Sequence, residues 1–136
     1  MAKTLKVLTA LLALCGVVTA TAFAAKAHLE LSRSKGKVGS SVTATATGLK
    51  SGRYIMSVQG TSSPGGSCYE EFGPVKMADK GRVKLTAKIP KRIHCHGAES
   101  TTSYKLTPGK YRLQVSAPVS ASRARSTVSS PFRVVK

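Results

Sequence analysis

The sequence predicts an all-β fold, an antiparallel sandwich or barrel of about seven short strands. Apolar and polar residues alternate with a period of two in three segments, which is typical of strands that bury one face. Turn-forming stretches rich in Gly, Ser and Pro separate the candidate strands, namely KGKVGS, GLKSG, TSSPGGS, ADKG and LTPG. No segment shows a convincing apolar stripe at helical spacing. Short strands at regular intervals, joined by turns, indicate a sandwich or a barrel.

The first 24 residues have the pattern of an export signal. Lys3 and Lys6 give a positive start, an apolar core follows, and a small-residue tail ends in Ala22-Phe23-Ala24. We therefore expect a signal peptide over residues 1–24 and a secreted or periplasmic, cell-envelope location.

The mature chain is expected to be one β-sandwich domain over residues 25–136. Cleavage after Ala27 is a second option. Retention of the N-terminal segment as an anchor is a third, because residues 7–25 carry no charge and approach the roughly 20 residues of a spanning helix.

The three clearest strands are predicted at residues 42–47, 82–89 and 110–117. We expect their alternate apolar residues to face inward; these are Val42, Ala44 and Ala46, then Val83, Leu85, Ala87 and Ile89, then Tyr111, Leu113, Val115 and Ala117. Weaker candidates lie at 28–32, 54–59, 74–77 and 131–136. Pro131, at the start of the last of these, suits an edge where a missing N–H removes no ladder hydrogen bond.

Two stretches resemble a known superfold. LTPGKYRLQVSA, at 106–117, resembles the E–F corner and F strand of immunoglobulin-like and fibronectin type III-like modules. KVGSSVTATATGLKSGRYIMSVQG, at 37–60, resembles the A–B and B–C region of bacterial immunoglobulin-like domains, including the neocarzinostatin-like chromoproteins. The resemblance implies an immunoglobulin-like β-sandwich in which Tyr111 is the corner tyrosine, its hydroxyl bonding to the upstream backbone.

The chain departs from these families at specific positions. Leu113 stands where a classical immunoglobulin domain has its second core cysteine, and the sequence has no tryptophan. The chromoproteins have two disulfides and an acidic surface, whereas this chain has one possible pair and a basic surface. An enediyne-type ligand is therefore not expected.

Cys68 and Cys95 are the two cysteines left after removal of the signal peptide. Two cysteines in one small exported domain usually pair, so we predict a disulfide that joins the connection after strand C to the E–F connection. A disulfide that closes a loop of this length adds about 3 to 4 kcal/mol to the free energy of unfolding in the chain-entropy description.

Catalytic chemistry has little support in the sequence. A cysteine nucleophile with a histidine base needs an orienting carboxylate or amide, yet the only aspartate is Asp79 and there is no asparagine. Glu70 and Glu71 are adjacent, so they point to opposite sides of an extended chain. We expect a protein that is not an enzyme and needs no cofactor.

A copper site is the alternative reading of the histidines. If residues 94–96 are extended, His94 and His96 project to one side and Cys95 to the other. Cleavage after Ala27 would make His28 the N-terminus. Its amine and imidazole could then bind copper as in the CopC-like periplasmic copper carriers, with His94 or His96 completing a nitrogen-rich site.

The net charge of +17, from 22 basic and 5 acidic residues, points to anionic partners. Removing Lys3 and Lys6 leaves 20 basic residues (22 − 2) and a charge of +15 on the mature chain. Envelope polymers, other polyanions and membrane surfaces are the expected partners, bound through outward and loop cations: Arg82, Lys84, Lys88, Lys91, Arg92, Lys110 and Arg112. One positive stripe would result if the strands that carry them share a sheet. The alternative is that these side chains only keep the surface solvated and the edges unpaired. Sparse aromatic residues argue against recognition of nucleic-acid bases.

Overall fold

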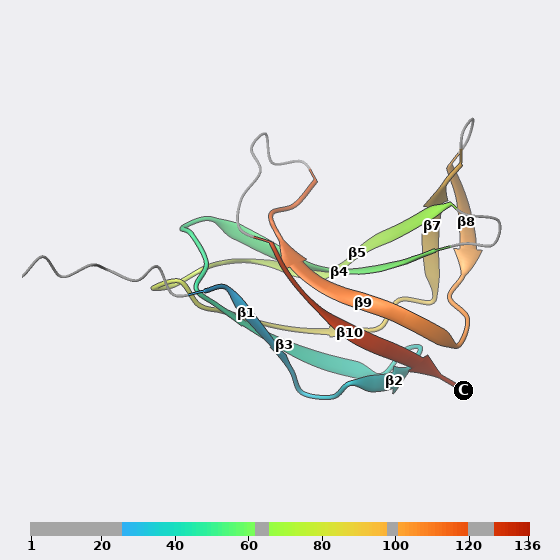
Figure 1. Ribbon diagram of the computed structural model, residues 1–136, viewed down its shortest axis with the longest axis horizontal. Coiled ribbons are helices and arrows are strands. Elements are labelled where there is room, and N and C mark those ends of the chain that lie inside the picture. Colours follow the sequence, from blue (N-terminus) through green and yellow to red (C-terminus); the bar gives the residue numbers. More distant parts are fainter. Residues whose placement is uncertain (1–25, 62–65, 98–100, 120–126) are drawn as a thin grey trace, which may run out of the picture.

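The structure is a computed structural model that describes residues 26–61, 66–97, 101–119 and 127–136, and these residues form strands and connections without any helix (Figure 1). The ten strands are β1 (His28–Leu31), β2 (Lys35–Lys37), β3 (Ser41–Thr47), β4 (Arg53–Thr61), β5 (Ser67–Met77), β6 (Val83–Lys88), β7 (Arg92–His96), β8 (Thr101–Lys105), β9 (Gly109–Ser116) and β10 (Val128–Val135).

The strands form two sheets, as the predicted sandwich requires. The smaller sheet has the order β1-β3-β6, and the larger has the order β2-β10-β9-β4-β5-β7-β8. In the lettering of immunoglobulin-like sandwiches, β1, β3 and β6 take positions A, B and E, while β4, β9 and β10 take C, F and G. One pairing is parallel: β2 runs alongside β10, with Lys35 opposite Arg133. All other paired strands are antiparallel.

The predicted number of about seven strands is too low, since ten are present. The strand β2 has only three residues around a glycine, and we had assigned it to a turn. The strands β7 and β8 form a hairpin inside the connection between positions E and F, which we had treated as irregular. The last strand begins at Val128, three residues before the predicted start.

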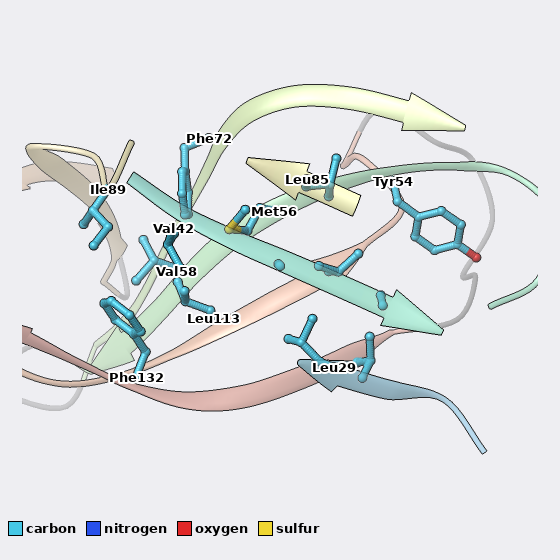
Figure 2. Packing of buried hydrophobic residues seen from close by; sticks show 14 of the residues in the cluster. Leu29, Val42, Tyr54, Met56, Val58, Phe72, Leu85, Ile89, Leu113 and Phe132 are labelled. Atoms are coloured by element: carbon cyan, nitrogen blue, oxygen red, sulfur yellow. The ribbon is translucent and has the colours of Figure 1, made fainter. Parts of the chain in front are cut away.

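The core lies between the two sheets and includes most of the residues whose alternation predicted it (Figure 2); Ala87 and Tyr111 are only partly buried, and Ala117, also predicted to face inward, is not part of it. Val42, Ala44 and Ala46 of β3 are buried, and so are Leu85 of β6 and Leu113 of β9. Each large apolar side chain buried in this way contributes about 1.5 to 3 kcal/mol. The period-two pattern of these three strands therefore fixes which face of each sheet looks inward.

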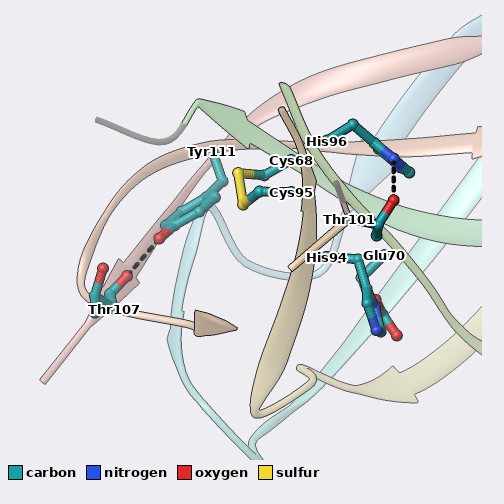
Figure 3. Close-up of a disulfide and its surroundings, with 8 residues drawn as sticks. All are labelled: Cys68, Glu70, His94, Cys95, His96, Thr101, Thr107 and Tyr111. Atoms are coloured by element: carbon teal, nitrogen blue, oxygen red, sulfur yellow. Dashed lines mark hydrogen bonds and ion pairs between the residues drawn. A yellow bond between two sulfur atoms is a disulfide. The ribbon is translucent and has the colours of Figure 1, made fainter. Parts of the chain in front are cut away.

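The turn before β9 has the corner geometry that the resemblance implied. The Tyr111 hydroxyl donates a hydrogen bond to the backbone oxygen of Thr107 at 2.8 Å, which confirms Tyr111 as the corner residue (Figure 3). Its ring covers Gly60 of the neighbouring β4, where a Cβ atom would come within 2.7 Å of the ring. Glycine at position 60 therefore leaves the space that the tyrosine ring fills.

Cys68 and Cys95 lie directly opposite each other on β5 and β7, with their sulfur atoms at disulfide distance. Both side chains are buried, and Figure 3 shows them beside Tyr111. The predicted pairing agrees with this geometry. The two residues stand on neighbouring strands, however, and not in the irregular loops where we had placed them.

The strand β5 bends at Gly73, where it passes close to β6. Gly73 has a φ of +82°, and a Cβ atom there would lie 2.5 Å from the Cβ atom of Ala87. Beyond the bend, residues 73–77 are exposed. The predicted strand at 74–77 is thus the end of a much longer strand, and Val75 and Met77 face solvent.

Pro131 lies in the middle of β10 and not at its start. The Arg133 N–H donates to the Ser34 oxygen on the β2 side, so an N–H at position 131 would point the same way. Because the pairing with β2 begins only at Arg133, the proline occupies a free stretch of the strand edge.

Candidate polyanion interface

The seven basic residues predicted to bind polyanions do not form one stripe, because β6 and β9 belong to different sheets. Lys84 and Lys88 lie on β6 of the smaller sheet, and Arg82 immediately precedes that strand. Lys110 and Arg112 lie on β9 of the larger sheet. A single positive stripe was expected only if these strands shared a sheet, and they do not.

Lys110 is part of a row of three cations that crosses the outer face of the larger sheet. The strand register places Lys35 of β2 opposite Arg133 of β10, and Arg133 opposite Lys110 of β9. All three side chains are exposed. Because neighbouring strands are about 5 Å apart, the row spans about 10 Å. We call these three residues the cationic row.

Two further cations extend the row along the strands. Lys37 stands two residues beyond Lys35 on β2, and Arg112 stands two residues beyond Lys110 on β9. Residues two apart on a strand project from the same face. We call Lys35, Lys37, Lys110, Arg112 and Arg133 together the basic face.

None of the described acidic side chains stands on the strands that carry the basic face. Glu30 is on β1, Glu70 and Glu71 are on β5, and Asp79 is in the turn after β5. The strands β2, β9 and β10 carry no acidic residue. The five cations are thus adjacent to like charges, which an anionic partner would relieve.

A shallow depression of about 450 Å³ lies beside the cationic row. Gln59, Gly60, Lys110, Tyr111, Arg112 and Pro131 line it. A second, of about 280 Å³, shares Lys110, Tyr111 and Pro131 and extends to Arg133. Pro131 pairs with Arg112 in the register, so a short ring stands between longer cationic side chains.

Arg112 is held in place by a neighbouring strand. Its guanidinium donates to the Ser129 hydroxyl oxygen from Nη2 at 2.9 Å and from Nε at 3.3 Å. These bonds to a neutral partner fix the direction of the side chain and leave its charge uncompensated. Arg112 therefore forms one wall of the depression.

Lys91 and Arg92 are separate from the basic face. Arg92 donates from Nε and Nη2 to the side chain and backbone oxygens of Ser103 on β8, both at 2.8 Å. The Lys91 backbone oxygen accepts the Leu106 N–H. Both residues stand at the β7–β8 side of the larger sheet, several strands from β10, and the bonds of Arg92 give it a role in holding the hairpin together.

The extended conformation at residues 94–96 puts His94 and His96 on the exposed side of β7 and Cys95 on the buried side. His94 Nδ1 pairs with Glu70 Oε2 at 2.5 Å, and His96 Nδ1 hydrogen-bonds the Thr101 hydroxyl at 3.0 Å (Figure 3).

The three histidines are not brought together. His28 lies on β1 in the smaller sheet, and β1 and β7 lie at opposite ends of the view in Figure 1. Within the described ranges, no group of three or more His, Cys, Asp or Glu side chains could hold a metal ion.

The segment that follows β9 lies against the outer face of β4 and β5. The Val119 N–H donates to Glu71 Oε1 at 2.7 Å, and the Tyr69 hydroxyl donates to the same oxygen at 3.1 Å. Ile55 and Ser116 pair with each other across β4 and β9 and point away from the core, yet both are buried. The alternation of residues 110–117 puts Ser116 on the side opposite Leu113 and Val115, so it was expected to face solvent, and that prediction is wrong.

Tyr69 should make the protein lose stability at alkaline pH. Burial raises the pKa of Tyr69 above its ordinary value of 10.0, and the nearby Glu71 carboxylate raises it further. Above pH 10 the unfolded chain releases this proton more readily than the folded one. The contribution of Tyr69 is therefore complete below pH 10 and is lost as the pH rises through the raised pKa.

Urea denaturation between pH 8 and pH 11 would measure this effect. We expect the wild type to lose more stability over that range than Tyr69→Phe, which has no phenol to titrate. Parallel stability curves for the two proteins would contradict the raised pKa.

Comparison with protein-family models, with curated proteins and with solved structures gave no match to this chain. The part of the chain that the structure describes contains no helix long and apolar enough to cross a membrane. The function must be inferred from the geometry of the chain itself.

Sequence reasoning identified Lys110 and Arg112 but missed Lys35, Lys37 and Arg133. Arg133 alternates with Phe132 and Val134, so its outward direction could have been predicted. Lys35 and Lys37 have the same alternation about Gly36, over a segment too short to stand out. Their position beside Arg133 depends on the parallel pairing of distant segments, for which the sequence has no local signal.

Proposed function

We propose that this protein is an exported, non-enzymatic module that binds anionic polymers through its basic face. The observation that carries the proposal is the cationic row, in which Lys35, Arg133 and Lys110 are adjacent across three strands. The absence of acidic residues from those strands and the net charge of +17 support it. The signal-like segment at residues 1–24 supports the location, and the disulfide distance between Cys68 and Cys95, which leaves neither as a free thiol nucleophile, supports the non-enzymatic role.

An exposed row of cations on an open sheet face suits a polymer better than a small ligand. The row and the adjoining depression are open to solvent and rest on strands whose other face packs in the core through Leu113, Phe132 and Val134. Because these cations stand on paired strands, little backbone freedom is lost when they bind a repeating anion. Attraction of this kind is electrostatic and weakens steeply as salt rises.

Two charge-matched double variants separate a defined interface from net charge. Lys110→Gln/Arg133→Gln removes two charges from the basic face, and Lys84→Gln/Lys88→Gln removes two from the exposed side of β6 in the smaller sheet. The probe is a fluorescein-labelled oligothymidylate, used as a generic phosphodiester polyanion and titrated by anisotropy at several salt concentrations.

We expect Lys110→Gln/Arg133→Gln, the face variant, to make the negative slope of log K against log salt shallower by about 1.4. Each phosphate contact on a single strand contributes about 0.7 to the size of that slope. The β6 variant should change the slope by less than half as much. Equal losses in the two variants would show that only overall charge matters, and an unchanged face variant would refute the interface.

A further inference from the structure

One end of the sandwich is closed by two turns that are hydrogen-bonded to each other. The Leu49 N–H donates to the Gly81 oxygen, and the Ala78 N–H donates to the Gly52 oxygen, both at 2.9 Å. The Tyr54 hydroxyl also donates to the Lys50 oxygen at 2.8 Å. The turns at 48–52 and 78–82 are thus joined in one hydrogen-bonded unit, which lies at the left of Figure 1, far from β2 and the C-terminus.

This end of the molecule carries a second concentration of positive charge. We define the loop end as the two turns and the strand residues next to them, with six basic residues: Lys26, Lys50, Arg53, Lys76, Lys80 and Arg82. All six are exposed, and Asp79 is the acidic residue among the described residues of the two turns. The loop end shares no residue with the basic face.

Two apolar side chains are exposed among these cations. Val75 is 45% exposed and Met77 is 61% exposed, on the part of β5 that follows the bend at Gly73. Met77 pairs with Arg53 in the register and is the next residue after Lys76. Apolar side chains surrounded by lysine and arginine are typical of surfaces that enter the boundary between lipid headgroups and acyl chains.

The chain enters the sandwich at this same end. Lys26 is the first described residue, and β1 begins with His28 opposite Thr47, which directly precedes the turn at 48–52.

From the cations of the loop end and the two apolar side chains exposed among them, we infer that the loop end docks on an anionic phospholipid bilayer. The cations contact lipid phosphates, and Met77 and Val75 enter the headgroup boundary. The inference goes beyond the proposed function, since it concerns other residues and another partner. Each basic residue close to an anionic bilayer strengthens binding by about fivefold.

The test measures partition of the full chain onto two kinds of vesicle, phosphatidylcholine alone and phosphatidylcholine with phosphatidylglycerol at 7:3. The readout is the ratio of the two partition coefficients, because this ratio isolates the part of the binding that depends on anionic lipid. Lys76→Gln/Lys80→Asn alters the loop end. Asparagine is chosen because Lys80 has a φ of +49°, which asparagine tolerates. Lys110→Gln/Arg133→Gln is the charge-matched control.

We expect the ratio to fall by about tenfold or more in the loop-end variant and by less than threefold in the control. Met77→Ser should weaken partition onto the anionic vesicles as well. An unchanged ratio in the loop-end variant, or an equal fall in the control, would overturn the inference. The loop-end variant should still bind oligothymidylate. Failure of the bilayer inference would therefore appear in the vesicle ratios alone, and failure of the polymer interface would appear in the oligothymidylate titrations alone.

Discussion

Replacing both Cys68 and Cys95 with alanine should lower the free energy of unfolding by about 3 to 4 kcal/mol. The bond would close a loop with a sequence separation of 27, and the cross-link restricts the unfolded chain more than the folded one. Urea denaturation of the oxidised wild type and of the double variant measures the difference. The denaturant dependence should also be steeper in the variant, because its unfolded chain exposes more surface.

The reduced wild type is the matched control for the double variant. Its urea midpoint should fall close to that of the variant, because both proteins lack the cross-link. The two differ only in the two buried sulfur atoms, so any remaining gap between the midpoints measures the loss of those atoms from the core. Equal midpoints for oxidised wild type and double variant would contradict the expected stabilisation. Two reactive thiols in the unreduced, denatured wild type would show that no disulfide forms.

Gly73→Ala should lower the free energy of unfolding by about 2 to 4 kcal/mol. Its φ of +82° is unfavourable for any residue with a Cβ atom, which contributes about 1 kcal/mol or more. The added methyl group would also lie 2.5 Å from the Cβ atom of Ala87, so β5 and β6 must separate. Overpacking of this kind contributes a further 1 to 3 kcal/mol or so.

Two other variants separate backbone strain from crowding. Gly39→Ala places alanine at a nearly identical φ of +80° with nothing within 4 Å of the new Cβ atom, so it measures strain alone. Gly73→Ala/Ala87→Gly removes the opposing methyl group and should recover part of the loss. If Gly73→Ala and Gly39→Ala were equally destabilising, the close approach of β5 to β6 would have no energetic weight.

The sequence predicts the sandwich well where a strand has one buried face. The strands β3, β6 and β9 alternate strictly, and the corner tyrosine Tyr111 follows a Pro/Gly turn, so both the inward faces and the corner were predicted. Prediction fails where burial comes from elsewhere in the chain. Ser116 and Ile55 are buried on the outer face of the larger sheet, and the alternation of their own strands does not encode that burial.

The candidate interface was predicted only in part, for a topological reason. The outward direction of Lys110 and Arg112 follows from the alternation of β9. Which cations stand beside them depends on strand order, and alternation within one strand contains no information about its neighbours. We therefore grouped Lys84 and Lys88 with Lys110, although the structure puts them in the other sheet.

The parallel pairing of β2 with β10 joins the first and last parts of the domain. Because the partners of β2 are residues 133–135, the larger sheet stays incomplete until those residues have been synthesised. Pairings between segments so distant in sequence form late and slowly. A product that stops before residue 133 would keep most of its core but could not bring Lys35, Arg133 and Lys110 together, so the charge array exists only after these two distant segments have paired.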